Sequence, residues 1–228
     1  SFVCKFVANF DNDGTVMDYK MKVLAIGAHA DDVELGCGGS LLKWAREGHE
    51  IFIYVVTESG YAKHDGTVIR ATETALTEAR ISAERIGANL VQGDFKTFGL
   101  EPGNALNSAI LAVIEDIHPD LVVTHWDGDS HTDHRAIGVS SLHACRHVPS
   151  ILMYASNLYH GTTAFDGRIC VDIGDTLEDK LDLLAIFESE FKRTDGKWRD
   201  QVHHQAALAG LSWNVSHAET FQVVRHLL

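Results

Sequence analysis

Ten residues near the start of the chain constrain its fold more than any other stretch: Ala25-Ile26-Gly27-Ala28-His29-Ala30-Asp31-Asp32-Val33-Glu34. The apolar run from Val23 to Ile26 is typical of a buried strand, and it leads directly into one histidine and three carboxylates. Ionised groups at the end of a strand are costly unless solvent, a partner or a metal satisfies them. We therefore expect His29, Asp31 and Asp32 to belong to a site, with a metal ion as the working hypothesis.

A second apolar run later in the chain ends in the same way. Leu121-Val122-Val123 leads into residues 125–135, which contain three histidines and three aspartates. His131 and His134 are three residues apart, so a helix would place them on one face. Such a pair is weak evidence by itself in a chain with 14 histidines, but its position after a strand strengthens it. Asp133 or Asp129 is expected to orient one imidazole, because functional histidines commonly donate their second N–H to a carboxylate.

Segments typical of strands alternate with helical patterns along the chain. Strands are expected at Lys22–Gly27, Glu50–Thr57, Leu90–Val91, Asp120–Thr124, Ile151–Tyr154 and Ile169–Ile173. Helices are expected from Ser40 as a cap to Gly48, and at Ile69–Ile86, Asn104–Ile117, Arg135–Arg146, Leu177–Phe191 and Gln201–Leu211. This alternation predicts an α/β protein with a parallel sheet covered on both faces. Sites in such sheets lie outside the carboxyl ends of the strands, so the two charged stretches are expected to meet on one rim.

The size, charge and cysteine content of the chain limit the number of domains, the class of partner and the cellular compartment that we expect. A chain of 228 residues fits one domain, which we expect over residues 21–228, with 1–20 as an extension of unknown role and a turn at Asp13-Gly14. A net charge of −13 argues against nucleic acid or an anionic membrane as the main partner. The four cysteines form no C-x-x-C pair, which favours a reduced, cytoplasmic protein. No apolar run approaches the roughly 20 residues of a membrane span.

The first charged stretch has the chemistry of a catalytic metal site. Zinc binds histidine nitrogen and carboxylate oxygen, and a catalytic site uses three protein ligands with one position left for water. His29 and Asp32 can converge on one ion from a tight turn, while Asp31 between them points elsewhere and is free to act as a base. The alternative is an acidic loop that caps the following helix. That alternative is preferred for Glu34, but it explains neither His29 nor the density of charge.

Three other features near these stretches are not expected to carry chemistry. Gly36-x-Gly38-Gly39 does not match a dinucleotide-binding loop, and the preceding carboxylates would repel a pyrophosphate. Cys37 is expected to be a packed thiol rather than a nucleophile, since no Cys-His arrangement accompanies it. The pair His203-His204 is expected to be surface or local structure.

Candidate substrate contacts are fewer and rest on residue type alone. Trp126 is expected either to stack on a sugar ring or to be buried at the rim. Asp129 lies in the same loop and is a second candidate. Arg70 and Arg135 could bind an anionic or hydroxylated substrate, with solvation at the surface as the alternative for each.

The two charged stretches together resemble a known family. Gly27–Gly39 is similar to the signature loop of the LmbE-like (PIG-L) zinc-dependent N-deacetylases, and His131-Thr132-Asp133-His134-Arg135 is similar to their second motif. The likeness extends over about Met21 to Phe221. Supporting segments are Thr57-x-x-Gly60, Glu78–Gly87, Val171-Asp172-Ile173 with Lys180, and Ala218-Glu219-x-Phe221.

The resemblance implies a Rossmann-like three-layer sandwich with a mainly parallel sheet. It also implies hydrolysis of N-acetyl groups, usually on glucosamine-type sugars and their conjugates. Carried over by position, the residues that resemble the zinc ligands are His29, Asp32 and His134. Asp31 resembles the general base, His131 the residue that stabilises the oxyanion, and Asp133 the partner that orients His131.

Two positions depart from the family pattern. Ala30 stands where proline is usual; some members, including bacillithiol-pathway deacetylases, also have alanine there. Ala75 stands where the helix usually carries an arginine, three residues before its glutamate. Arg70 is a candidate to make the substrate contacts of that arginine.

The expected function is therefore removal of an N-acetyl group from an amino sugar or its conjugate by a zinc-dependent hydrolase. Two alternatives stay open: a metal-dependent hydrolase of another amide or acyl group, using zinc or another divalent ion, and a carbohydrate-binding module without activity. The presence of both Asp31 and His131 counts against the module, because a structural metal site needs neither. A homo-oligomer is compatible with either class.

Overall fold

The structure is a computed structural model that describes residues 9–10, 16–17, 20–157, 159 and 163–227. At the N-terminus, β1 (Asn9–Phe10) pairs antiparallel with β2 (Val16–Met17). The turn expected at Asp13-Gly14 lies outside the described residues.

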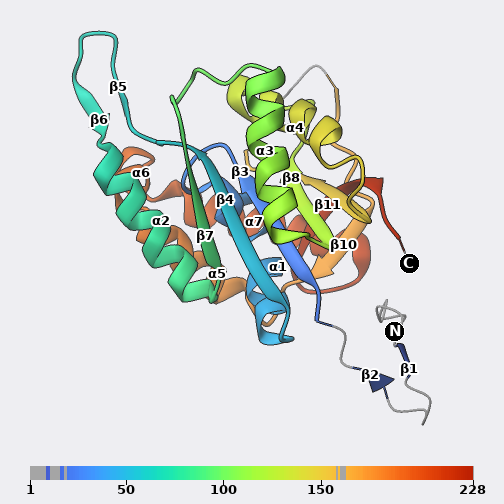
Figure 1. Ribbon diagram of the computed structural model, residues 1–228. Helices are drawn as coiled ribbons and strands as arrows, with labels where there is room; N and C mark the ends of the chain where they lie inside the picture. The colour runs from blue at the N-terminus through green and yellow to red at the C-terminus, as the bar shows by residue number, and fades with distance from the viewer. Residues whose placement is uncertain (1–8, 11–15, 18–19, 158, 160–162, 228) are drawn as a thin grey trace.

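The body of the molecule is built on a seven-stranded sheet in the order β10-β11-β9-β8-β3-β4-β7 (Figure 1). The strands are β3 (Lys22–Gly27), β4 (Glu50–Thr57), β7 (Asn89–Phe95), β8 (Leu121–His125), β9 (Ser150–Tyr154), β10 (Ile169–Asp172) and β11 (Ala218–Arg225). The five strands from β7 to β9 are parallel, and β11 pairs antiparallel with both β9 and β10. The expected α/β fold with a mainly parallel sheet is confirmed.

Helices cover both faces of this sheet, because successive strand residues point to opposite sides. Val23 and Ala25 pack in one core with residues of α1, α2 and α5, while Leu24 and Ile26 pack in another with residues of α3 and α4. The helices are α1 (Asp32–Arg46), α2 (Thr72–Ile86), α3 (Asn104–Ile117), α4 (Thr132–Ala144), α5 (Leu177–Ile186), α6 (Glu188–Arg193) and α7 (Lys197–Trp213). The central strands are buried on both sides, which is why they read as unbroken apolar runs.

The order of the strands fixes where a site can form. From β3 the chain moves outward through β4 to β7, and then returns to β8 on the other side of β3. The strand order therefore reverses between β3 and β8, and the crevice outside their carboxyl ends is where open α/β sheets bind ligands. Both charged stretches follow these two strands, so the fold brings them together.

Helix α1 begins earlier than expected. It starts at Asp32 rather than after Ser40, and a break in helical geometry at Cys37 separates its glycine-rich part from the rest. Gly36 is required there, since a Cβ at this position would lie 2.0 Å from Cδ2 of Tyr154. The expected end is confirmed, because Gly48 follows the C-cap with a positive φ of 89°.

Other boundaries differ where local sequence is weakly patterned. A hairpin of β5 (Tyr61–Ala62) and β6 (Val68–Arg70) precedes α2, and β6 includes Ile69 and Arg70, which were expected to begin the helix over Ile69–Ile86. The helix expected over Leu177–Phe191 is divided into α5 and α6 by Phe187, whose side chain is fully buried. Within the described residues, no helix is long and apolar enough to cross a lipid bilayer.

A buried charge cluster, which we call the Glu219 cluster, ties β11 to α1 and α5. It consists of Glu219, Lys180 and Ser40, each with 5% exposure or less. Lys180 Nζ donates to Glu219 Oε1 at 2.5 Å, and Ser40 donates to Oε2 through its backbone N–H (2.7 Å) and its hydroxyl (2.5 Å). Gly39 N–H donates to Oε1 at 2.9 Å. Both oxygens of this carboxylate are therefore satisfied within the fold.

Candidate active site

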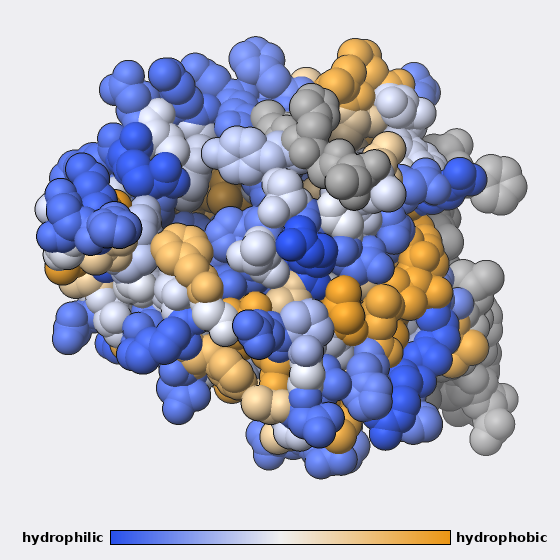
Figure 2. Space-filling model, turned by 90° about the horizontal axis from the view of Figure 1, so that it is seen from above, coloured by the Kyte–Doolittle hydropathy of each residue, from blue (hydrophilic) through white to orange (hydrophobic). Residues whose placement is uncertain are grey.

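The two charged stretches meet at the rim of a cavity of about 360 Å³. The cavity opens at the carboxyl end of the parallel strands, the end seen in Figure 2, where the surface is mostly hydrophilic with separate hydrophobic patches. Its lining residues are His29, Asp31, Asp32, Leu35, Ser59, Tyr61, Arg70, Thr97, Phe98, His131, His134, Ser156, Asn157, Tyr159, Glu190, Arg193, Trp198 and Gln201.

The loop between β3 and α1 is held in an unusual conformation. Asp31 has φ of 123°, a region that residues other than glycine rarely adopt. Hydrogen bonds on each side fix it: Ala30 N–H donates to Ser59 Oγ at 2.9 Å, and Ala30 C=O accepts from Arg70 at 2.8 Å. Ala28 N–H donates to His125 Nε2 at 3.0 Å. Strain of this kind persists only where the surroundings over-determine it, and it clusters at functional sites.

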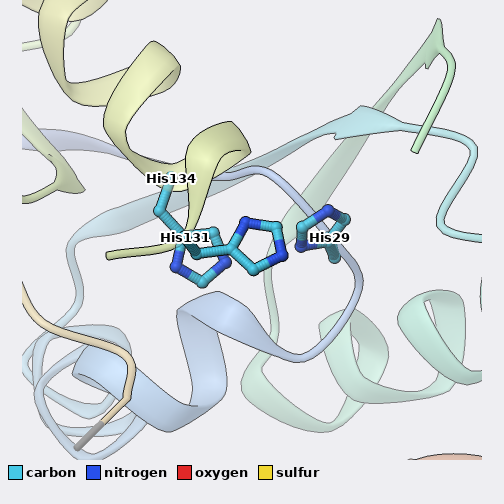
Figure 3. Close-up of side chains that lie close together, drawn as sticks. All are labelled: His29, His131 and His134. Atoms are coloured by element: carbon cyan, nitrogen blue, oxygen red, sulfur yellow. The ribbon is translucent and has the colours of Figure 1, made fainter. Parts of the chain in front are cut away.

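His29, Asp32 and His134 converge around the Asp32 carboxylate. Asp32 Oδ2 lies 3.2 Å from His29 Nδ1, and Asp32 Oδ1 lies 3.1 Å from His134 Nε2. Figure 3 shows the imidazoles of His29, His131 and His134 gathered between the β3–α1 loop and the start of α4. The structure thus brings together the three residues that were expected to bind the metal.

The outer nitrogen of each of these two histidines faces another carboxylate. His29 Nε2 lies 2.9 Å from Asp133 Oδ2, and His134 Nδ1 lies 3.1 Å from Asp129 Oδ2. An outer N–H that donates to a carboxylate leaves the inner nitrogen free to act as a ligand, which is the usual arrangement around metal-binding histidines. This donor set of two imidazoles and one carboxylate fits zinc or a related divalent ion.

The charges of this cluster are strongly coupled to one another. Burial disfavours a charged His29, but the Asp32 charge and hydrogen bonds with Asp133 and Asp32 outweigh it and raise the pKa of His29 to about 9. Burial also disfavours a charged His134, but the Asp32 charge and the hydrogen bond with Asp129 outweigh it and raise the pKa of His134 to about 10. Burial disfavours a charged Asp32 as well, yet the neighbouring His134, His125 and His29 hold the pKa of its carboxyl well below its usual range.

Two overlapping groups of potential ligands are present. Ligand atoms of His29, His131 and His134 lie within 4.8 Å of one another, and so do those of Asp32, His125 and His134. His125 was not expected to take part. It is fully buried at the end of β8, its ring stacks on His134 with centroids 4.1 Å apart, and its Nδ1 has no hydrogen-bond partner among the described residues. The sequence indicated its position only indirectly: His125 is the last residue of β8, beside the place where the strand order reverses between β3 and β8.

His131 has the protonation that an oxyanion donor needs. Its Nδ1 accepts a hydrogen bond from the Asp133 backbone N–H at 3.2 Å as it caps α4, so the ring proton of the neutral form belongs on Nε2. Burial, followed by the charges on His134 and His29, lowers the pKa of His131 to about 4. A neutral ring with an N–H donor therefore lines the cavity.

Asp31 lies beside the buried guanidinium of Arg70. Arg70 Nη1 donates to Asp31 Oδ2 at 3.2 Å, and Nη2 donates to Glu78 Oε2 at 2.7 Å. Burial raises the pKa of Asp31 well above its usual range, Arg70 opposes this shift, and Asp32 adds to it. Arg70 comes from β6 and bonds Glu78 of α2, the helix in which Ala75 stands where the family resemblance implies an arginine. Arg70 thereby holds the Asp31 carboxylate in place, although it lies in β6 and not in α2.

The structure places several other candidates differently from expectation. The Asp133 carboxylate bonds His29 and the backbone N–H groups of Phe98 and Leu100, not the His131 ring that it was expected to orient. Asp129 is 3% exposed, and its carboxylate forms hydrogen bonds with His131 N–H, the His134 ring and the Asn157 side chain. The Asp133 carboxylate thus orients the ring of His29, and the Asp129 carboxylate orients the ring of His134. Asp129 itself does not line the cavity.

Trp126 and Arg135 also lie outside the cavity lining. Trp126 is 7% exposed and packs against Phe165 with ring centroids 5.6 Å apart, which agrees with the alternative of a residue buried at the rim. Arg135 donates to the backbone carbonyl of Asp129 at 2.8 Å and so supports the loop before α4. Cys37 is fully buried, and burial raises the pKa of its thiol well above the usual value, in keeping with a packed residue.

The comparison with protein families now identifies the class. A family model described as PIG-L, GlcNAc-PI de-N-acetylase, matches residues 24–145, which include both charged stretches. The chain belongs to the PIG-L (LmbE-like) family, as the two motifs predicted. It is thus a member of a family of deacetylases, hydrolases that cleave the amide bond of an N-acetyl group.

Individual relatives agree with this assignment. The uncharacterized deacetylase YaiS of Escherichia coli K12 is 34% identical over 141 residues, which cover 58% of this chain and 72% of YaiS. The diacetylchitobiose deacetylase of Thermococcus kodakarensis is 28% identical over 188 residues, or 75% of this chain and 70% of that protein. The structure of N,N'-diacetylchitobiose deacetylase from Pyrococcus horikoshii superposes with a TM-score of 0.78 at 21% identity, over 90% of this chain and 84% of that one.

Proposed function

We propose that this protein removes the N-acetyl group of an amino sugar of the N-acetylglucosamine type, free or conjugated, and releases acetate and the free amine. His29, Asp32 and His134 would hold a divalent ion, with zinc as the first candidate. One observation carries the proposal: the Asp32 carboxylate lies between inner nitrogens of two histidines whose outer nitrogens each face a carboxylate. The two relatives that deacetylate diacetylchitobiose support the choice of sugar.

Residues around the proposed metal ligands would have separate roles in amide hydrolysis. A bound ion supplies Lewis-acid chemistry, which lowers the pKa of water and polarises a carbonyl. Asp31 would take the proton from the attacking water as the new C–O bond forms. His131 would donate its Nε2–H to the oxyanion that develops on the carbonyl oxygen. Asp31 would then return the proton to the nitrogen as the C–N bond breaks, giving a neutral amine that can leave.

Arg70 and Glu78 act on this sequence through Asp31. The guanidinium of Arg70 donates a hydrogen bond to Asp31 Oδ2, so the Asp31 carboxylate is held in one orientation through both proton transfers. Glu78 holds the guanidinium in turn, and Ser189 bonds Glu78 through its N–H (3.0 Å) and its hydroxyl (2.8 Å). We assign Arg70 a positioning role in place of the direct substrate contact suggested by its residue type.

Acetate release from a defined panel tests the proposed function. Protein stripped with a chelator and reloaded with zinc, manganese or cobalt would be given N-acetylglucosamine, its methyl glycoside, diacetylchitobiose, N-acetyl amino acids and simple acyl esters. We expect metal-dependent acetate release from the sugars. Release from the non-sugar compounds alone would contradict the substrate class. Tight binding of the sugars by fully loaded protein, without acetate release, would show a binding module.

A further inference from the structure

Phe98 combines two properties that are unfavourable in a residue without a function. The residue is 57% exposed, and its backbone has φ of 64°, in the left-handed region that bulky residues seldom adopt. A residue in this region adds strain that persists only where the surroundings enforce it. Neither property serves the core, so the ring is held at the cavity for another purpose.

The backbone of Phe98 is fastened to the catalytic cluster. Its N–H donates to Asp133 Oδ2 at 2.7 Å, and Leu100 N–H donates to Oδ1 at 3.2 Å. The same Oδ2 lies 2.9 Å from His29 Nε2. One carboxylate therefore sets both the orientation of a proposed ligand and the position of the phenyl ring, so that the ring keeps a fixed relation to the reacting centre.

The ring lies beside both the reacting groups and a second aromatic residue. Its centroid is 5.7 Å from that of His131 and 6.1 Å from that of His29. On the other side it lies 5.5 Å from the Tyr61 ring, at an interplanar angle of 73°. Tyr61 is held by its hydroxyl, which donates to the buried Glu190 Oε1 at 2.6 Å. Both rings line the cavity and form an aromatic corner adjacent to the proposed oxyanion donor.

We propose that Phe98, supported by Tyr61, is the stacking surface for the pyranose ring of the substrate and makes the enzyme selective for ring-closed amino sugars. This inference rests on the proposed function and specifies its substrate. A closed pyranose presents a flat face of C–H groups that can cover an exposed phenyl, whereas an open-chain amino alditol keeps the N-acetyl group and the C3, C4 and C6 hydroxyls but has no such face. Burying the ring on binding is favourable because exposed apolar surface leaves water. The phenyl has no proton to transfer and no ligand atom, so it acts in recognition.

The test compares two substrates that differ in ring closure: methyl N-acetylglucosaminide and N-acetylglucosaminitol. Phe98→Asn removes the ring and places the residue type that best tolerates a positive φ. We expect kcat/KM for the glycoside to fall about 10- to 100-fold, the range for loss of one buried apolar side chain, mainly through KM. Turnover of the alditol should change less than about twofold. Phe98→Trp keeps an aromatic face and should retain the preference.

His118→Asn is the matched control. His118 also has a positive φ, 55°, but it ends α3 and does not line the cavity. Relief of backbone strain predicts that both asparagine variants melt at the wild-type temperature or above it. Only Phe98→Asn should lose the preference for the glycoside.

The outcomes separate this inference from the proposed function. Equal losses with both substrates would show that Phe98 only supports the loop, and no loss with either would show that it has no role; each result overturns the inference while wild-type activity stands. Acetate release by the wild-type protein from neither compound, with the metal bound, would overturn the proposed function and the inference with it.

Discussion

Two of the buried clusters of charge in the described part of the chain differ in how far their groups are satisfied. In the Glu219 cluster, one carboxylate accepts from Lys180, Ser40 and a backbone N–H, and all of these groups belong to the fold. In the cluster of His29, Asp32 and His134, inner nitrogens face the carboxylate, and the rings line a cavity. Both clusters join segments distant in sequence and border a cavity, but the groups of the Glu219 cluster satisfy one another within the fold.

A structural charge cluster can be distinguished from a functional one by features other than burial. Burial and ion pairing are common to both and do not decide the matter. At the second cluster, the backbones of Asp31 and Phe98 have positive φ, and Nδ1 of His125 has no hydrogen-bond partner among the described residues. We therefore expect substitutions in the second cluster to lower activity and leave stability near the wild-type value, and substitutions in the Glu219 cluster to lower stability and leave activity near the wild-type value.

The largest expected effect is on catalysis, from Asp31→Asn. Loss of the general base should lower kcat about 10²- to 10⁴-fold, because an amide cannot accept the proton. Asparagine tolerates the positive φ, and Arg70 can still contact its side-chain oxygen, so zinc content and the free energy of unfolding should stay near wild-type values. Steady-state acetate release, metal analysis and denaturant titration measure the three quantities. An unchanged rate with metal retained would show that Asp31 is not the base.

The counterpart in the structural cluster is Glu219→Gln. Removing one partner of a buried ion pair leaves Lys180 uncompensated, so unfolding should become easier by about 3–5 kcal/mol. Activity of the remaining folded protein at 25 °C should change less than about twofold. The double variant Lys180→Met with Glu219→Gln removes the buried charge and keeps an amide oxygen for the N–H groups of Gly39 and Ser40, so it should recover most of the stability. Loss of zinc by Glu219→Gln without loss of stability would abolish the distinction between the clusters.

A smaller effect is expected from Asp129→Asn, which changes a carboxylate behind one of the proposed ligands. The carboxylate that orients His134 becomes an amide of the same shape, and metal affinity should fall about 10- to 100-fold. Competition with a chromophoric chelator measures it. Asp127→Asn makes the same change of charge two residues away and is the control. Equal losses in both variants would attribute the effect to net charge instead of orientation.

The smallest effect concerns proton release when the metal binds. Without metal, His29 and His134 have pKa values of about 9 and about 10, above the ordinary value near 6.5, so both rings are charged at pH 7. Their contribution to the stability of the metal-free protein is present below about pH 6.5 and is lost as pH rises through 9 to 10.

A bound ion needs both rings neutral, so loading at pH 7 should release about two protons. Calorimetry in two buffers of different ionisation enthalpy counts them. Heats that do not depend on the buffer would contradict the assignment of these two histidines as ligands. Repeating the measurement with Glu219→Gln should give the same number of protons, because that cluster is outside the site.

Much of the fold could be predicted because its central strands are buried on both faces. Expected bounds for β3, β4 and α3 agree with the structure, since unbroken apolar runs and a regular helical stripe leave little choice. The start of α1 was missed because its first residues are acidic and glycine-rich. There the structure is set by contacts such as Gly36 against Tyr154, which lie far apart in sequence.

The site was predictable to the extent that its residues lie in contiguous motifs. His29, Asp32 and His134 meet because β3 and β8 are neighbours, which the alternation of strands and helices implied. The partners of Asp133 and Arg70 were not predictable, because either could reach several groups and only tertiary geometry selects one. His125 and Phe98 have no motif, and their importance comes from burial in one case and from backbone conformation in the other.

The separation of the two motifs also has a consequence for how the protein matures. His29 and Asp133 are 104 residues apart, and β8 must pair with β3 before the segments that carry them can meet. Closing so long a loop is a late and entropically expensive event in folding. An ion that depends on both segments therefore cannot template the fold, and we infer that the chain acquires its metal only after the sheet has assembled. Metal supply would then limit how much of the folded protein is active, and a bound ion would stabilise the sheet once it has formed.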